Sequence, residues 1–230
     1  MSSYAMARSY ERKPIRPEWL AYHGAQTATI LSVLYLLTVC VTGESWLPIV
    51  SIDAASPALM LSLLQCLLGV AALQVPALLV RRTRIRLPDG LCACFYAFVL
   101  AATVLGEMFS LYYRIPIWDS ILHLGSGVML GMLGSILLVQ FLQAKNCQRL
   151  LSPAAVAVAA ICFAVCAGVA WEMYEFAGDS LLGLNMQKCL LEDGTALVGK
   201  AALMDTMKDL LVDTLGAAVG AVWMQKKQKK

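Results

Sequence analysis

Long apolar stretches alternate with short polar connections along most of the chain. About 20 apolar residues suffice to cross a bilayer as a helix, and six stretches reach this length. Their approximate bounds are 21–41, 57–80, 91–113, 119–141, 153–178 and 201–224. The pattern predicts an all-α, polytopic membrane protein with about six transmembrane helices. Pro76 lies near the end of the second stretch, where it predicts a kink.

Composition agrees with this pattern and suggests the domain boundaries. Of the 230 residues, 60% are apolar and only 14% are charged, which is typical of an integral membrane protein. We expect a single helix bundle over residues 21–224. A polar N-terminal arm over residues 1–20 precedes it, and a basic tail over residues 225–230 follows it.

The basic residues cluster at the ends of the predicted helices and indicate an orientation. Six helices place both termini on one side, and cytoplasmic connections carry an excess of Lys and Arg. With both termini inside, fourteen Lys and Arg residues lie on the cytoplasmic side and three on the outer side. The sequence therefore predicts that the arm and the tail are both cytoplasmic.

Three aspartates interrupt the apolar pattern of the last predicted helix. Asp205, Asp209 and Asp213 recur every four residues, so they share one face, with about 6 Å of rise between successive positions. An ionised aspartate at the middle of a bilayer costs about 2.5–3.5 kcal/mol on insertion scales. We therefore expect this face to contact protein, water or a cation rather than lipid.

Other polar residues belong to the same outer half of the predicted bundle. Asp119 and His123 are four apart near the start of the fourth helix and share a face. Glu172 and Glu175 are three apart near the outer end of the fifth helix. With Glu107 and the three aspartates, seven carboxylates and one of the two histidines occupy the outer halves of four consecutive helices. The inner halves are nearly free of ionisable side chains.

This surplus of acids predicts a bound cation. Few basic side chains are available, so the carboxylates must be partly protonated or must hold cations. Carboxylates with one imidazole suit Zn, Mn or Fe, and an oxygen-rich set also admits Mg or Ca. The eight cysteines contain no Cys-x-x-Cys spacing, which argues against a thiolate zinc site. The predicted ligands of a divalent metal ion are Asp119, His123, Glu175 and Asp209, with Asp205 and Asp213 extending the site.

Each of these residues also has a structural interpretation. Asp119 can cap the fourth helix, and His123 can form a hydrogen bond between packed helices. Glu172 and Glu175 can lie at the membrane interface. A purely structural role fits the aspartates of the last helix least well. Glycine pairs that let helices approach closely are interpreted as structural, and they are Gly127 with Gly131, and Gly216 with Gly220.

Three motifs resemble those of a known group of proteins. The segments Asp119-Ser-Ile-Leu-His123, Trp171-Glu172-Met-Tyr-Glu175 and residues 205–217 resemble the YjdF-like family of bacterial inner-membrane proteins. More remotely they are similar to the VanZ-like group, in which Lys is usual at Ser120 and Asn at Asp213. The resemblance implies a multi-pass helical bundle in the bacterial plasma membrane and a role in the cell envelope, since VanZ-like proteins are associated with glycopeptide resistance.

The polar cluster supports three functional hypotheses. The leading one is a metal-assisted hydrolase or transferase that acts on a lipid-linked or envelope substrate. In it, Glu172 is the candidate general base for a metal-bound water. The second is an ion- or proton-coupled transporter, and the third is a non-enzymatic accessory protein of the envelope. The expected partners are membrane lipid and a lipid-linked substrate, and no nucleic acid.

Overall fold

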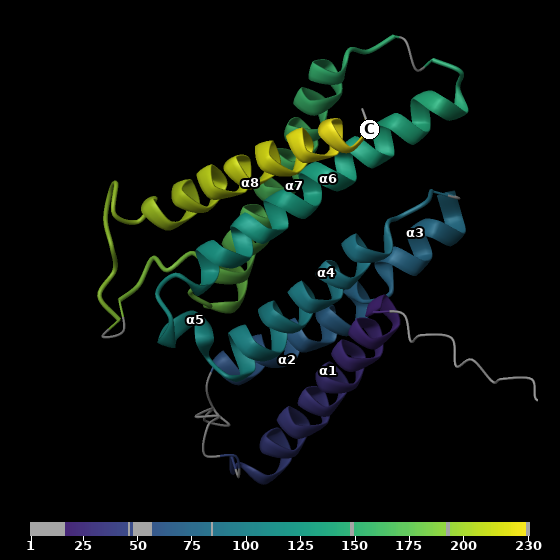
Figure 1. Ribbon diagram of the computed structural model, residues 1–230. Helices are drawn as coiled ribbons and strands as arrows, with labels where there is room; N and C mark the ends of the chain where they lie inside the picture. Colours follow the sequence, from purple (N-terminus) through teal and green to yellow (C-terminus); the bar gives the residue numbers. More distant parts are fainter. Residues whose placement is uncertain are drawn as a thin grey trace, which may run out of the picture.

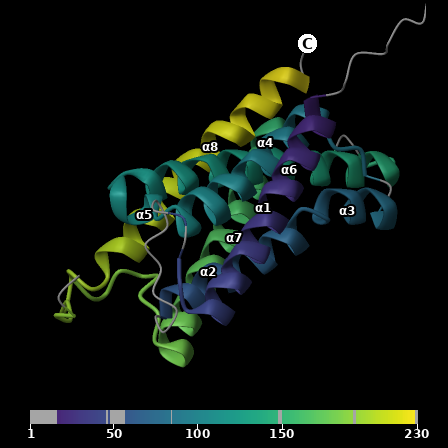
Figure 2. The same ribbon diagram turned by 90° about the horizontal axis from the view of Figure 1, so that it is seen from below.

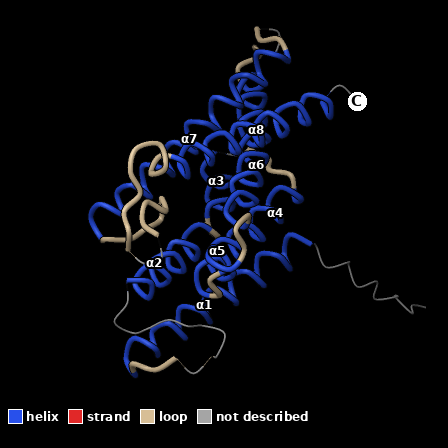
Figure 3. The backbone as a smooth tube through the Cα atoms, turned by 90° about the vertical axis from the view of Figure 1, so that its left-hand side faces the viewer, coloured by secondary structure: helices blue, strands red, loops and turns tan. Residues whose placement is uncertain are grey.

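The computed structural model describes residues 17–45, 47, 57–83, 85–147, 150–191 and 194–228, and this part is helical with no strand (Figure 3). The helices in chain order are α1 (Pro17–Thr42), α2 (Pro57–Ala72), α3 (Val75–Thr83), α4 (Asp89–Leu100), the π-helix η1 (Ala101–Met108), α5 (Leu111–Arg114), α6 (Trp118–Ala144), α7 (Pro153–Leu182) and α8 (Met204–Gln228). The prediction of an all-α fold is confirmed.

Five spans of the described chain are long and apolar enough to cross a membrane. They are Glu18–Thr42, Leu59–Thr83, Asp89–Met108, Trp118–Ala144 and Pro153–Leu182. Many large apolar side chains lie on the surface of these helices, as a lipid environment requires. A polytopic membrane protein is therefore confirmed.

The sixth predicted span forms a helix but differs from the other five in its charge. The helix α8 has 25 residues and is about 37 Å long, longer than the hydrocarbon core of a bilayer. It is not among the five spans, because acidic and basic side chains interrupt its apolar residues. It begins at Met204, not at the predicted Ala201, since residues 201–203 form a turn after Gly199, which has a φ of 59°.

The second and third predicted helices are interrupted. The kink predicted at Pro76 is a break between α2 and α3, where proline has no N–H to continue the helical hydrogen bonds. The third helix was expected to run to Tyr113 but ends at Met108. The cause is local, because Ser110 adopts a left-handed φ of 58° and turns the chain. Gly106 then accommodates the ring of Tyr112, which would lie 2.3 Å from a Cβ at position 106.

The helices α6 and α8 lie side by side in close contact (Figure 1). A Cβ built on Gly127 or Gly131 would lie 2.4 or 2.3 Å from a carbonyl oxygen of α8. One built on Gly216 or Gly220 would lie 2.4 or 2.1 Å from a carbonyl oxygen of α6. The predicted structural role of these four glycines is confirmed, and their absent side chains bring the polar faces of the two helices together.

The helices form two groups. The first contains α1, α2, α4 and η1, and the second contains α6, α7 and α8 (Figures 1 and 2). Buried apolar residues of the first group include Tyr35, Leu36, Cys66 and Val104. A cavity of about 290 Å³ lies between the two groups and is lined by both.

Part of the predicted organisation lies outside the described residues. Residues 1–16 of the N-terminal arm and residues 229–230 of the tail are in this part. The boundaries of the arm, bundle and tail, and the cytoplasmic position of both termini, stay predictions.

Candidate functional site

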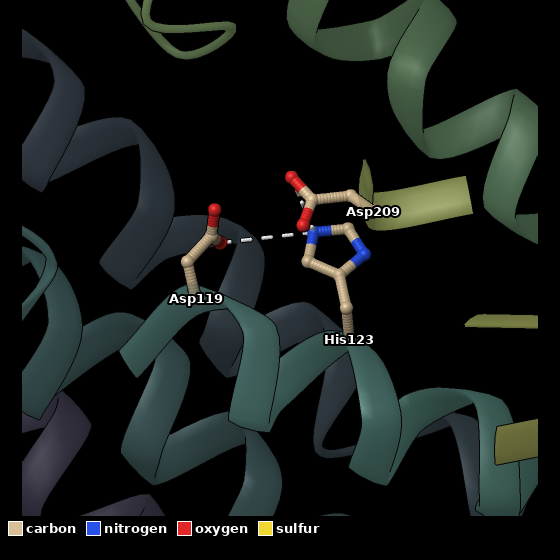
Figure 4. A group of neighbouring side chains, drawn as sticks. All are labelled: Asp119, His123 and Asp209. Carbon is tan, nitrogen blue, oxygen red and sulfur yellow. Dashed lines mark ion pairs between the residues drawn. The ribbon is translucent and has the colours of Figure 1, made fainter. Parts of the chain in front are cut away.

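His123 lies at the centre of a buried polar cluster between α6 and α8. Its side chain is 7% exposed. The Nε2 atom lies 3.7 Å from Asp119 Oδ1, one turn earlier on α6, and 4.0 Å from Asp209 Oδ2 on α8 (Figure 4). One ligand atom from each of these three residues lies within 4.8 Å of the others. Residues far apart in the sequence thus form one group.

The other nitrogen of His123 is fixed by Asp213. The Nδ1 atom lies 3.2 Å from Asp213 Oδ2, and because an ionised carboxylate only accepts hydrogen bonds, Nδ1 is the donor. Ser126 Oγ donates to Asp213 Oδ1 at 3.1 Å, which holds this carboxylate in place. Such a partner fixes the tautomer and the orientation of an imidazole, so Nε2 faces Asp119 and Asp209.

Asp213 has room for its carboxylate because α7 carries a glycine beside it. A Cβ built on Gly168 would lie 2.6 Å from Asp213 Oδ2. Any larger residue at position 168 would displace the carboxylate and, through it, the ring of His123.

Lys188 enters the cluster from the connection between α7 and α8. Its Nζ atom forms an ion pair with Asp119 Oδ2 and lies 3.2 and 3.3 Å from the two carboxylate oxygens of Asp205. Partial burial lowers the pKa of Lys188, but the carboxylates of Asp119 and Asp205 outweigh this effect and raise the pKa above its ordinary value. Lys188 therefore keeps its positive charge at physiological pH.

The end of α7 positions Lys188. Asp179 Oδ1 accepts a hydrogen bond from the backbone N–H of Met186 at 2.7 Å, and Oδ2 accepts one from Gln187 at 3.0 Å. Lys188 itself has a left-handed φ of 49°, which is uncommon for a residue with a side chain. Asp179 thus fixes the turn that directs Lys188 toward Asp119. Sequence reasoning missed Lys188 because only this turn brings it to the acids.

The two glutamates of α7 are both buried but differ in their contacts. Glu175 Oε1 accepts a hydrogen bond from Trp171 Nε1 at 2.9 Å, and Glu175 is not in the group of three ligand atoms found in the described chain. Glu172 is 5% exposed and lies within electrostatic range of His123. Neither oxygen of Glu172 has a partner at normal hydrogen-bond geometry among the described residues, but the side chains of Thr206 and Gln187 lie beside its carboxylate.

Asp209 also has an unsatisfied oxygen. The residue is 1% exposed, and its Oδ1 has no hydrogen-bond partner in the described part of the chain. A buried carboxylate without partners costs several kcal/mol unless it is protonated or meets a cation. This cost argues against a purely structural role for Asp209.

The charges of the cluster do not balance. Asp119, Asp205, Asp209 and Asp213 can carry four negative charges, whereas Lys188 and a protonated His123 supply two positive ones. Lys208, the neighbour of Asp209 in the sequence, has an exposed side chain. A divalent cation bound at a neutral His123 would, with Lys188, set three positive charges against the four negative ones, and a buried Asp–His–Asp group is able to hold such an ion.

These features define a polytopic helical membrane protein with a buried Asp–His cluster between two closely packed helices. The chain belongs to the family described as "Predicted membrane protein (DUF2238)", whose family model matches residues 29–230. No curated protein and no solved structure matches the chain. The match confirms membership of a family of membrane proteins. The more specific YjdF-like and VanZ-like resemblance stays a prediction.

Proposed function

We propose that the chain is a divalent-metal-dependent hydrolase or transferase that acts on a lipid-linked substrate in the bacterial inner membrane. The observation that carries the proposal is the buried group of Asp119, His123 and Asp209, whose ligand atoms lie within 4.8 Å of one another. Two ligand atoms bound to one cation at about 2.1 Å lie at most about 4.2 Å apart. The separations of 3.7 Å from His123 Nε2 to Asp119 Oδ1 and 4.0 Å to Asp209 Oδ2 meet this limit.

In this proposal each polar residue has a distinct role. Asp119 Oδ1, His123 Nε2 and Asp209 bind the metal ion. Asp213 orients the imidazole, and Asp205 extends the site by holding Lys188. Glu175 is predicted from the sequence as a ligand equal to these three, and it would have to give up its hydrogen bond from Trp171 to reach the metal.

Three protein ligands leave a coordination position for water, which is typical of catalytic metal sites. A bound cation lowers the pKa of that water and stabilises the negative charge that develops during hydrolysis or transfer. Glu172 is the candidate general base, because its carboxylate is buried near His123, with the side chains of Thr206 and Gln187 beside it. Zn, Mn and Fe suit the mixed ligands best, and Mg and Ca stay alternatives.

A proton relay to the inner side receives less support. It would need polar groups that continue from the cluster through the inner halves of the helices. Gln74 accepts a hydrogen bond from Tyr22, and the side chain of Gln140 is bonded to the backbone N–H and C=O of Arg86. Both amides are thus engaged in structural contacts. These contacts favour the enzyme hypothesis over the transporter hypothesis.

The test is metal binding by protein purified in detergent and stripped of metal. Isothermal titration calorimetry with Mn²⁺ or Zn²⁺ should find one ion per chain. His123→Ala and Asp209→Asn should each weaken binding about 100-fold or more, and the double variant should lose little beyond either single one. Asp89→Asn, at an exposed acid at the start of α4, is the control. Unchanged metal binding with additive losses of stability would refute the proposal.

Lys188 gives a prediction of opposite sign. Replacing it by methionine should tighten divalent binding by about tenfold or more, because its ammonium competes with the metal for Asp119. Lys188→Arg keeps the charge and should leave the affinity close to that of the wild type. Calorimetry with Mn²⁺ measures both variants. Equal affinity in the methionine variant would show that Lys188 and the metal do not share Asp119.

A further inference from the structure

The cavity between the two helix groups has a polar end and an apolar end. Asp119, His123, Lys188 and Asp213 line the polar end. The apolar part of the wall includes Leu61, Leu68, Ala72, Phe98, Val99 and Ala102 from α2, α4 and η1. Residues of α5, α6 and α7 complete the wall, and Gln65, Thr103, Glu107 and Glu175 add polar groups to it. The proposed metal site therefore opens into a space in which one ligand can contact both charged and hydrocarbon groups.

We propose that this cavity binds an amphiphile with one hydrocarbon chain and a phosphate head. The hydrocarbon chain of this ligand lies against α2 and α4, and its phosphate lies at the cation held by Asp119, His123 and Asp209. This inference rests on the proposed function, since it assigns the substrate class of the same site.

The phosphate head follows from the charges at the polar end. Lys188 lines the cavity with a side chain that is 39% exposed, so its ammonium can reach a ligand as well as Asp119 and Asp205. Phosphate oxygens bind both ammonium groups and divalent cations. Without the metal, however, the surplus of aspartates would repel an anionic head. Binding of the phosphate should therefore depend on the metal.

The size of the cavity indicates a ligand with one hydrocarbon chain. The whole cavity measures about 290 Å³, near the lower limit for small-molecule sites. A volume of this size suits one extended hydrocarbon chain, and Ala102 keeps the space open because its side chain is small.

The experiment uses the full chain in detergent and a dodecyl phosphate that carries a diazirine in its chain. After irradiation with saturating Mn²⁺, mass spectrometry should map the labels to α2 and α4 residues of the cavity wall. Omitting Mn²⁺ should reduce this labelling at least about fivefold. Ala102→Leu should reduce it similarly without changing Mn²⁺ affinity. Ala97→Leu is the matched control, because Ala97 is exposed on α4 and does not line the cavity.

A second variant covers the case in which Ala102→Leu does not fold. Phe98→Ala enlarges the apolar end and should shift the preferred chain to a longer alkyl phosphate. Labels that map only to the outer surface, or equal labelling in the Ala102 and Ala97 variants, would overturn the inference while leaving Mn²⁺ binding intact. Equal labelling with and without Mn²⁺ would overturn the assignment of the phosphate. Absence of Mn²⁺ binding would refute the proposed function instead. If cavity labelling were still sensitive to Ala102→Leu, it would support the binding site for the hydrocarbon chain without the metal.

Discussion

Replacing Asp209 by asparagine is expected to raise the melting temperature of the metal-free protein and to abolish its stabilisation by divalent metal. The wild-type carboxylate is buried, and its Oδ1 has no hydrogen-bond partner in the described chain. The side-chain amide of asparagine has the same shape but no charge. Removing a buried charge that is offset only weakly, by His123 Nε2 at 4.0 Å, should stabilise the metal-free protein by about 1–3 kcal/mol. Differential scanning fluorimetry in EDTA and in excess Mn²⁺ measures both effects.

Asp213→Asn is the matched control on the same face of α8. Asp213 accepts hydrogen bonds from His123 and Ser126, so its charge is compensated, and the same substitution should lower the melting temperature. The two variants therefore differ in sign although they make the same chemical change one helical turn apart. A loss of stability in Asp209→Asn as large as in Asp213→Asn would mean that Asp209 only connects α6 and α8.

Replacing Gly127 by alanine is expected to separate α6 from α8 and to disrupt the polar cluster. In most helices this change stabilises by up to about 1 kcal/mol, because alanine has the higher helix propensity. Here the added Cβ would lie 2.4 Å from the carbonyl oxygen of Asp213, and a helix backbone cannot move as a side chain can. We expect a net loss of about 1–3 kcal/mol and weaker metal binding, since Asp213 orients His123.

Gly125 supplies the comparison for this second prediction. It lies two residues earlier on α6, and a Cβ built there meets nothing within 4 Å. Gly125→Ala should therefore leave stability and metal binding unchanged or slightly improved. Thermal melting and calorimetry on the two variants separate close helix contact from helix propensity. Equal behaviour of the two would show that the contact between α6 and α8 is not tight at Gly127.

The membrane fold and the main members of the cluster could be predicted because each depends on a short-range pattern. Length and apolar content predict the helices. A spacing of four residues places Asp119 with His123 on one face of α6, and the same spacing aligns the aspartates of α8. The excess of acids over bases then predicts that these faces meet around a cation. The structure brings Asp119, His123 and Asp209 together as these patterns indicate.

The contacts that depend on loops could not be predicted in this way. Lys188 reaches Asp119 only because Asp179 accepts two backbone hydrogen bonds from the following turn. Likewise, the third helix ends early because Ser110 adopts a left-handed conformation. The spacing of apolar residues along the sequence does not predict this turn. The hydrogen bond that Trp171 donates to Glu175 depends on side-chain orientation, which the sequence does not reveal.

The acidic face of α8 has a consequence for how the protein is made. A helix leaving the translocon alone would expose three aspartates to lipid, at about 2.5–3.5 kcal/mol for each ionised group near the bilayer centre. The glycines of α6 offer α8 a surface where its backbone fits closely and where His123 and Lys188 meet its carboxylates. We therefore expect α8 to enter the membrane together with α6, so that this step of biosynthesis is assembly of the pair rather than insertion of one more independent segment.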